Sequence, residues 1–157
     1  MKRIVLYVLI LAAMFALPVE RTDVGKLRPI QTVSISKDGA WTILRTDTED
    51  IGMGKTVQEA LDNLKATTPG VVYLDTAVFL LVAEDAQDSI QDLRQVLRKN
   101  VKVCVADRGI DPVKATEYLA AHDNLPKLKH WEEGMQLPVL ELYNQKEIIL
   151  KKVEKRA

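Results

Sequence analysis

The chain has 157 residues, which is enough for one domain with or without a leader and too few for two cores of ordinary size. Its apolar content of 47% excludes a disordered polypeptide, and its 22 basic residues balance its 22 acidic ones, so no basic face of the kind that binds nucleic acid is expected. A single cysteine excludes an intramolecular disulfide and any multi-cysteine metal site.

The N-terminus has the composition of an export or anchor segment. Lys2 and Arg3 precede an apolar run over residues 4–17, which Pro18 closes. As a helix this run would be about 21 Å long, shorter than the ~30 Å hydrocarbon core of a bilayer, so it suits a signal peptide better than a spanning helix. The cleavage pattern is weak, because Met14 occupies a position that prefers a small side chain. An uncleaved signal-anchor therefore stays open, and a buried core helix is the remaining alternative.

The sequence divides into three parts. Residues 1–17 are predicted to be a signal peptide or signal-anchor, residues 18–28 a polar linker, and residues 29–157 a single α/β domain. Because positive charge stays in the cytoplasm, either form of leader places the domain outside the cytoplasm. The chain is therefore expected to be exported, and either tethered by an uncleaved leader or secreted.

A hairpin opens the domain. Alternating β-branched residues over 30–35 predict a strand, Asp38-Gly39 predicts a tight turn, and residues 41–45 predict the returning strand. The acidic, glycine-containing segment 47–54 is expected to be a loop.

A helix is expected next. Thr56 and Glu59 have the spacing of a capping box, and one apolar stripe follows at helical spacing: Val57, Ala60, Leu61 and Leu64. Pro69-Gly70 should end this helix. Residues 71–74 and 77–83 then predict a strand pair or one bent strand, and the second stretch is apolar on both faces, as in a central strand covered on both sides.

The rest of the domain alternates between helix and strand. A helix should begin at Asp85 or Asp88, bury Ile90, Leu93, Val96 and Leu97, and end at Asn100. The alternating run 101–105 predicts a strand, in which Cys104 packs as a small apolar group. Asp111-Pro112 should start a third helix that reaches about His122.

The C-terminal part is predicted to hold an irregular segment or short helix over 125–136, then a hairpin of strands 139–143 and 147–150 around residues 144–146. The fold class is therefore α/β, with a mixed sheet. A strand hairpin leads into helix, strand, helix, strand, helix, with the helices packed on the sheet and a hairpin at the C-terminus. The basic residues that follow are expected to form a solvated tail: Lys151, Lys152, Lys155 and Arg156.

One motif suggests a phosphate loop and fails. The segment 52–56 has the sequence GMGKT, but a complete phosphate loop needs a glycine five residues before Gly54, where this chain has Glu49. An acid in that cradle would repel phosphate. A loop entering a Thr-capped helix accounts for the segment.

Two charged pairs follow predicted strands, where sites of α/β proteins often lie. Asp107-Arg108 is expected to form an exposed ion pair, and Glu84-Asp85 is expected to cap a helix. His122 and His130 lack metal-ligand spacing, and the turn 130–133 is expected to be solvated and anchored by Trp131. No catalytic, cofactor-binding or metal-ligating residue is therefore predicted, which favours a binding or assembly role over an enzyme.

The order of motifs resembles the N-terminal domain of the Ger(x)C family, the C-subunit lipoproteins of bacterial spore germinant receptors. The family's "GKT-x-x-EA" helix start is matched by residues 54–60, and its apolar strand with a "GE"-like turn is similar to residues 78–84. Residues 93–106 follow its helix-to-strand passage, and residues 137–141 look like the segment that leads into its second domain. The resemblance covers roughly residues 18–150.

The resemblance implies a non-enzymatic subunit on the outer face of the spore's inner membrane, working beside polytopic membrane germinant-receptor subunits. Two features depart from the family. The lipobox cysteine expected near residues 18–21 is absent, and so are the family's later domains. A free-standing exported domain that binds a small molecule or cell-wall fragment is the main alternative, and an exported hydrolase is the third.

Overall fold

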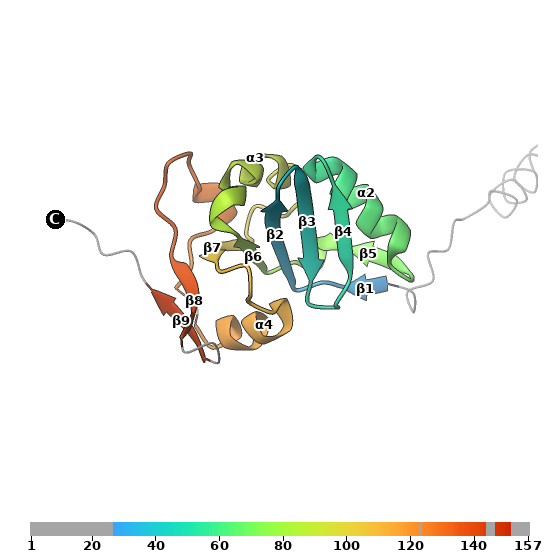
Figure 1. Ribbon diagram of the computed structural model, residues 1–157. Coiled ribbons are helices and arrows are strands. Elements are labelled where there is room, and N and C mark those ends of the chain that lie inside the picture. The colour runs from blue at the N-terminus through green and yellow to red at the C-terminus, as the bar shows by residue number, and fades with distance from the viewer. Residues whose placement is uncertain (1–26, 123, 144–146, 152–157) are drawn as a thin grey trace, which may run out of the picture.

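The protein is described from a computed structural model, over residues 27–122, 124–143 and 147–151 (Figure 1). A seven-stranded mixed sheet organises the domain. Its strands, from one edge to the other, are β4 (Ile51–Gly54), β3 (Trp41–Thr46), β2 (Thr32–Asp38), β6 (Phe79–Val82), β7 (Lys102–Ala106), β8 (Val139–Tyr143) and β9 (Glu147–Lys151). The four central strands, from β2 to β8, are parallel, and each edge ends in antiparallel pairs. The α/β class and the two hairpins are confirmed.

Helices and 3₁₀ turns cover both faces of the sheet (Figure 1). They are α2 (Val57–Thr67), η2 (Leu74–Thr76), η3 (Glu84–Ser89), α3 (Ile90–Leu93), α4 (Pro112–Ala120) and η4 (Leu128–His130). One apolar core, here called the α2-side core, contains Leu44, Leu61, Leu80, Ile90, Val103 and Trp131. The opposite one, the α4-side core, contains Phe79, Leu81, Cys104, Ala115, Leu119 and Leu140. Since β6 contributes to both, it is the doubly covered central strand that its sequence predicted.

The helix starts are confirmed. The Thr56 hydroxyl accepts a hydrogen bond from the Glu59 amide at 3.1 Å, and the Glu59 carboxylate accepts one from the Lys55 amide at 2.8 Å. In a standard capping box the Glu side chain accepts from the amide of the cap residue itself. Here it accepts from Lys55, the residue before the cap. At α4 the Asp111 carboxylate accepts from the Val113 amide at 3.0 Å. Each bond satisfies an amide that a helix start leaves unpaired.

The prediction of a loop over 47–54 is wrong for its second half, because residues 51–54 form the edge strand β4. Its glycines lie against α2: a Cβ on Gly52 would meet the Ala60 carbonyl oxygen at 2.2 Å, and one on Gly54 would meet the Ala60 amide nitrogen at 2.4 Å. The glycines are needed for close approach of strand and helix rather than for a flexible loop.

Two boundaries near the start of the domain also differ. Residues 27–29, of which the first two were assigned to the linker, form β1 (Leu27–Pro29), which pairs in parallel with β5 (Val71–Tyr73) in a separate two-stranded sheet. Residues 71–74 are consequently neither a hairpin partner nor a continuation of β6. The predicted leader and the rest of the predicted linker lie outside the described residues.

The helix predicted from Asp85 or Asp88 to Asn100 is much shorter, because η3 occupies its first part and α3 is one turn long. Neither aspartate caps it. Asp88 pairs with Lys37 at 2.5 Å, Asp85 pairs with Arg108, and the cap position is Ala83. The lysine beside Asp88 lowers the pKa of that carboxyl.

The apolar stripe predicted for this helix is buried at Ile90, Leu93 and Leu97, as expected.

The connection from α4 to β8 crosses from one face to the other. Leu125 belongs to the α4-side core, whereas Leu128, Trp131 and Leu137 belong to the α2-side core. Between them the chain runs beside the start of β7 and is hydrogen-bonded to it: the Val103 amide donates to the Pro126 carbonyl at 2.8 Å, and the Leu128 amide to the Val101 carbonyl at 2.7 Å.

Within the described part of the chain, every helix is too short or too polar to span a bilayer.

Candidate binding crevice

A crevice lies where β6 and β7 end. The chain leaves β6 through η3 and α3, which pack in the α2-side core, and leaves β7 toward α4, which packs in the α4-side core. In an open α/β sheet, two neighbouring parallel strands whose connections leave toward opposite faces open a crevice at their carboxyl ends, and this is the usual ligand position. Here the crevice is an open groove with a volume of about 1130 Å³.

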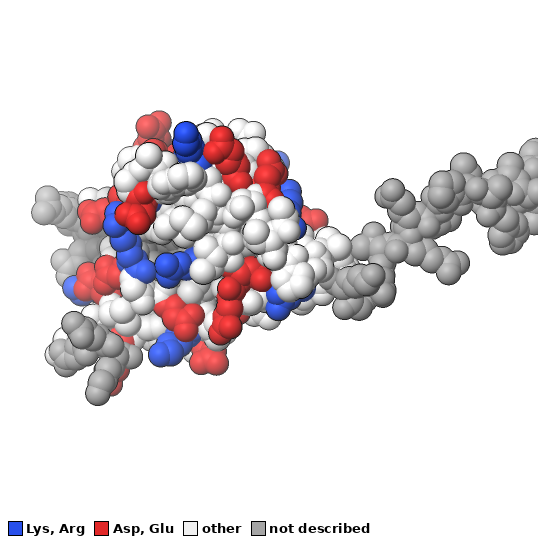
Figure 2. Space-filling view, turned by 45° about the vertical axis from the view of Figure 1, so that its right-hand side comes forward, with Lys and Arg blue, Asp and Glu red and all other residues white. Residues whose placement is uncertain are grey.

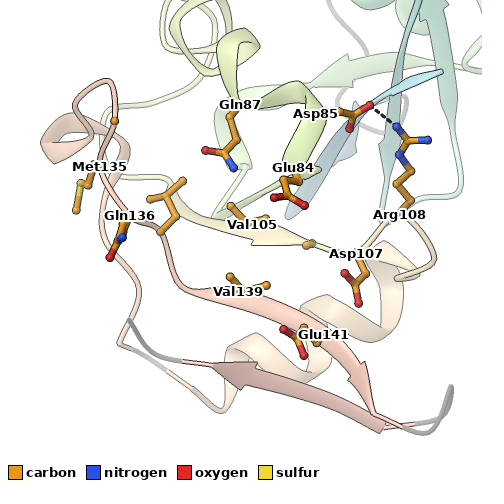
Figure 3. Close-up of a pocket in the computed structure, with 13 residues that line it drawn as sticks. Glu84, Asp85, Gln87, Val105, Asp107, Arg108, Met135, Gln136, Val139 and Glu141 are labelled. Carbon is orange, nitrogen blue, oxygen red and sulfur yellow. Dashed lines mark hydrogen bonds and ion pairs between the residues drawn. The ribbon is translucent and has the colours of Figure 1, made fainter. Parts of the chain in front are cut away.

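Acidic side chains outnumber basic ones in the lining of the crevice (Figure 3). Glu84 and Asp85 come from the segment after β6, Asp107 from the end of β7, and Glu141 from β8. Arg108 is the basic residue among the lining residues. Four carboxylates against one guanidinium give the lining a formal charge of −3, which becomes −2 when Lys151, the partner of Glu141 outside the lining, is counted. The remaining negative charge favours a cationic occupant through the potential it creates.

The structure brings together the two charged pairs that the sequence placed at strand ends. Arg108 forms an ion pair with Asp85, which follows β6, and the dashed line in Figure 3 shows this pair at one side of the crevice. The predicted ion pair between Asp107 and Arg108 is wrong, because Arg108 pairs with Asp85 and Asp107 accepts a hydrogen bond from the Leu142 amide instead. The prediction that Glu84-Asp85 cap a helix is wrong, since η3 has no side-chain cap.

The other acids differ in what they contact. Asp107 accepts a hydrogen bond from the Leu142 amide at 3.3 Å, which ties the end of β7 to β8. Glu141 lies 2.5 Å from Lys151 of β9. Glu84 makes no hydrogen bond or ion pair with the residues that the structure describes, so its carboxylate is available to a ligand. Figure 3 shows Glu84 on the same side as Gln87, facing Val105 and Val139.

One wall of the crevice was missed by the sequence analysis. Residues 134–137, between η4 and β8, contribute Gly134, Met135, Gln136 and Leu137 to the lining. Gly134 has a φ of 82°, a backbone conformation that glycine adopts without strain. Trp131 and Leu137, both buried, anchor the two ends of this wall. The predicted anchoring role of Trp131 is therefore confirmed, and its site lies at the base of the wall.

The remaining candidates lie elsewhere and are accounted for locally. The His122 ring stacks on Tyr118 with centroids 4.2 Å apart, and His130 ends η4. The GMGKT segment has no free amide cradle: the Met53 amide donates to the Asn63 side chain at 3.0 Å, and the Lys55 amide donates to Glu59. Among the described residues, no three His, Cys, Asp or Glu side chains gather closely enough to hold a metal ion.

Cys104 is buried in β7, as its alternating pattern predicted. Burial raises the pKa of its thiol to about 12. Since the thiolate is the nucleophilic form, a thiol with this pKa is inert near neutral pH. Its position in the α4-side core gives it a packing role.

No family model, no curated protein and no solved structure matches the chain.

Proposed function

We propose that the chain is a non-enzymatic, extracytoplasmic binding domain whose ligand site is the acidic crevice at the ends of β6 and β7. The observation that carries this proposal is the lining itself, with four carboxylates and one guanidinium around about 1130 Å³. A ligand with more than one primary amine suits this charge, because each ammonium group can donate to a different carboxylate of the lining.

The polar groups of the lining suit recognition of a charged ligand. The lining contains no serine, threonine, cysteine, lysine or histidine, so a nucleophile activated by a neighbouring histidine or lysine cannot be assembled there, and its acid–base groups are the four carboxylates. The carboxylates are also spread over three segments that follow or belong to different strands. They are therefore placed to contact separate groups on one ligand.

Removing single charges tests this assignment. Spermidine is the probe, and tricarballylate, an anion of comparable size, is its counterpart. Glu84→Gln and Asp107→Asn are each expected to weaken spermidine binding about two- to fivefold, since an exposed charge contact contributes about 0.5–1 kcal/mol. Isothermal titration calorimetry at low salt measures the change.

Asp62→Asn is the matched control for that experiment, because Asp62 is an exposed acid on α2 whose contact is to Gln58. It removes the same charge from the protein without altering the crevice. Equal weakening in Asp62→Asn and Asp107→Asn would show that spermidine responds to net charge alone and would remove the support for the crevice.

A role in spore germination belongs to the same proposal. It is supported by the resemblance of residues 54–60, 78–84 and 93–106 to the Ger(x)C N-terminal domain. On this proposal the domain acts at the outer face of the cytoplasmic membrane, beside polytopic germinant-receptor subunits. Affinity purification of the tagged full chain from spore membranes is expected to recover such subunits. Purifications that repeatedly recover the chain without them would contradict this role.

A further inference from the structure

The sheet face of β3 and β4 opposite α2 is apolar and largely exposed. Trp41, Ile51 and Met53 are 48%, 48% and 47% exposed, and Ile43 lies between them. The register pairs Ile43 with Met53 and Arg45 with Ile51, so these side chains share one face, and Trp41 lies two residues before Ile43 on the same strand. We call Trp41, Ile43, Ile51 and Met53 the β3–β4 face. Figure 1 shows no helix in front of it, and Figure 2 shows a broad area without charged atoms at this end of the molecule.

The edge of β4 is not available for strand addition. The outward Met53 amide is bonded to the Asn63 side chain, and the Thr67 hydroxyl lies 3.4 Å from the Ile51 carbonyl oxygen. An extended peptide therefore finds this edge already bonded by α2. What stays open is the β3–β4 face itself, which also carries Arg45 and borders Asp38, the register partner of Trp41 on β2. At its Ile51 end the surface is hollowed between Arg45, Ile51 and the segment before α4. An exposed apolar surface with a tryptophan and an arginine has the chemistry of a membrane interface.

The Ile51 end of the face lies close to the point where the chain enters the domain, and Trp41 lies at the other end of β3. Arg28 of β1 is 3.0 Å from the carboxylate of Asp50, the residue that precedes Ile51, and the Gln31 amide donates to Asp47 of the same turn at 3.1 Å. Only residues 18–26 separate β1 from the apolar run 4–17. Ten residue steps from Leu17 to Leu27 reach at most about 35 Å. A leader held in a bilayer would therefore limit this end of the domain to within about 35 Å of the lipid.

The geometry points to the β3–β4 face as a docking surface for a lipid bilayer, which holds the domain against the membrane that carries its leader. The apolar run covers only residues 4–17, and a short apolar segment gives stronger attachment when a second membrane contact supports it. Trp41, Ile51 and Met53 supply that contact. The inference depends on the leader staying attached and does not depend on the crevice, which lies across the sheet at β6, β7 and β8.

The two tryptophans make the test specific, because Trp41 is exposed and Trp131 is 8% exposed. The full chain is reconstituted into vesicles of brominated phosphatidylcholine, whose bromines quench tryptophan within the acyl region. A docked side chain lies about 5–10 Å into the headgroup and acyl boundary, so we expect Trp41 emission to fall about twofold relative to unbrominated vesicles. The Trp41→Phe variant contains Trp131 as its remaining tryptophan, so its emission gives the contribution of Trp131 to the fluorescence of the natural chain.

Matched serine variants separate the face from the tether. Ile51→Ser combined with Met53→Ser should abolish the quenching of Trp41, whereas Ile149→Ser, an exposed isoleucine on β9 at the opposite sheet edge, should leave it unchanged. Quenching that persists in the double variant would overturn the inference. So would a vesicle-bound chain without quenching, a chain that stays in the aqueous phase, or a soluble dimer that shields Trp41 from iodide before lipid is added. Spermidine binding, measured in the same samples, reports separately on the crevice.

Discussion

Gly52→Ala is expected to lower the free energy of unfolding by about 2–3 kcal/mol, the upper part of the usual range of about 1–3 kcal/mol for overpacking. The added methyl would lie 2.2 Å from the Ala60 carbonyl oxygen and 2.6 Å from Leu64 Cβ. Both are parts of α2 that cannot rotate away, so strand and helix must separate. That separation would loosen the α2-side core around Leu44 and Leu61. Urea denaturation followed by circular dichroism measures the loss.

Gly109→Ala is the control for this experiment. A methyl there would meet only Leu142 Cδ1, at 3.5 Å, which is ordinary contact. Its effect should stay within about 0.5 kcal/mol. If Gly52→Ala unfolds at the same urea concentration as the natural chain, the close packing of β4 on α2 is wrong, and residues 51–54 are the loop that their glycines first suggested.

Trp131→Ala is expected to cost about 3–5 kcal/mol in the free energy of unfolding and to weaken spermidine binding in the molecules that stay folded. Trp131 is buried in the α2-side core at the base of the wall formed by residues 134–137. Its loss removes packing and releases one side of the crevice. Thermal unfolding and calorimetry on the same sample measure the two effects.

His130→Ala is the neighbouring control, because His130 is exposed at the end of η4. It should change neither stability nor binding appreciably. A Trp131→Ala chain that loses stability but binds spermidine with unchanged affinity would show that the wall is not part of the site.

Local sequence signals predicted most of the fold. The capping box at Thr56, the Asp111-Pro112 helix start and the Asp-Gly hairpin turn each depend on neighbouring residues, and each is present in the structure. Apolar content on both faces also placed β6 at the centre of the sheet. Such features can be predicted because their physical causes lie within a few residues of one another.

The predictions of local structure were wrong where contacts between residues far apart in the sequence determine the structure. Gly52 and Gly54 suggested a loop, yet they lie in a strand. The backbone of α2, later in the chain, packs directly against them and leaves no room for a Cβ atom. Asp85 was expected to cap a helix, but Arg108, 23 residues away, bonds it instead. Alternation of Ile51 and Met53 with the glycines was the one signal for β4 available in the sequence.

The crevice was only half predictable. The positions of Glu84-Asp85 and Asp107-Arg108 after strands marked the correct edge of the sheet. Their meeting at one crevice depends on β6 and β7 being neighbours whose connections leave toward opposite faces. The wall of residues 134–137 follows from the path that the chain takes beside β7 after Pro126, which no local pattern encodes.

The central claim is that the crevice is the ligand site, and titration of the ¹⁵N-labelled protein with spermidine tests it most directly. The account predicts that amide shifts move at residues 84–87, 105–108 and 134–137, which line or border the crevice, and that tricarballylate leaves them unchanged. Shifts scattered over the exposed acids of α2 and the other surface elements, or equal responses to the cation and the anion, would contradict it.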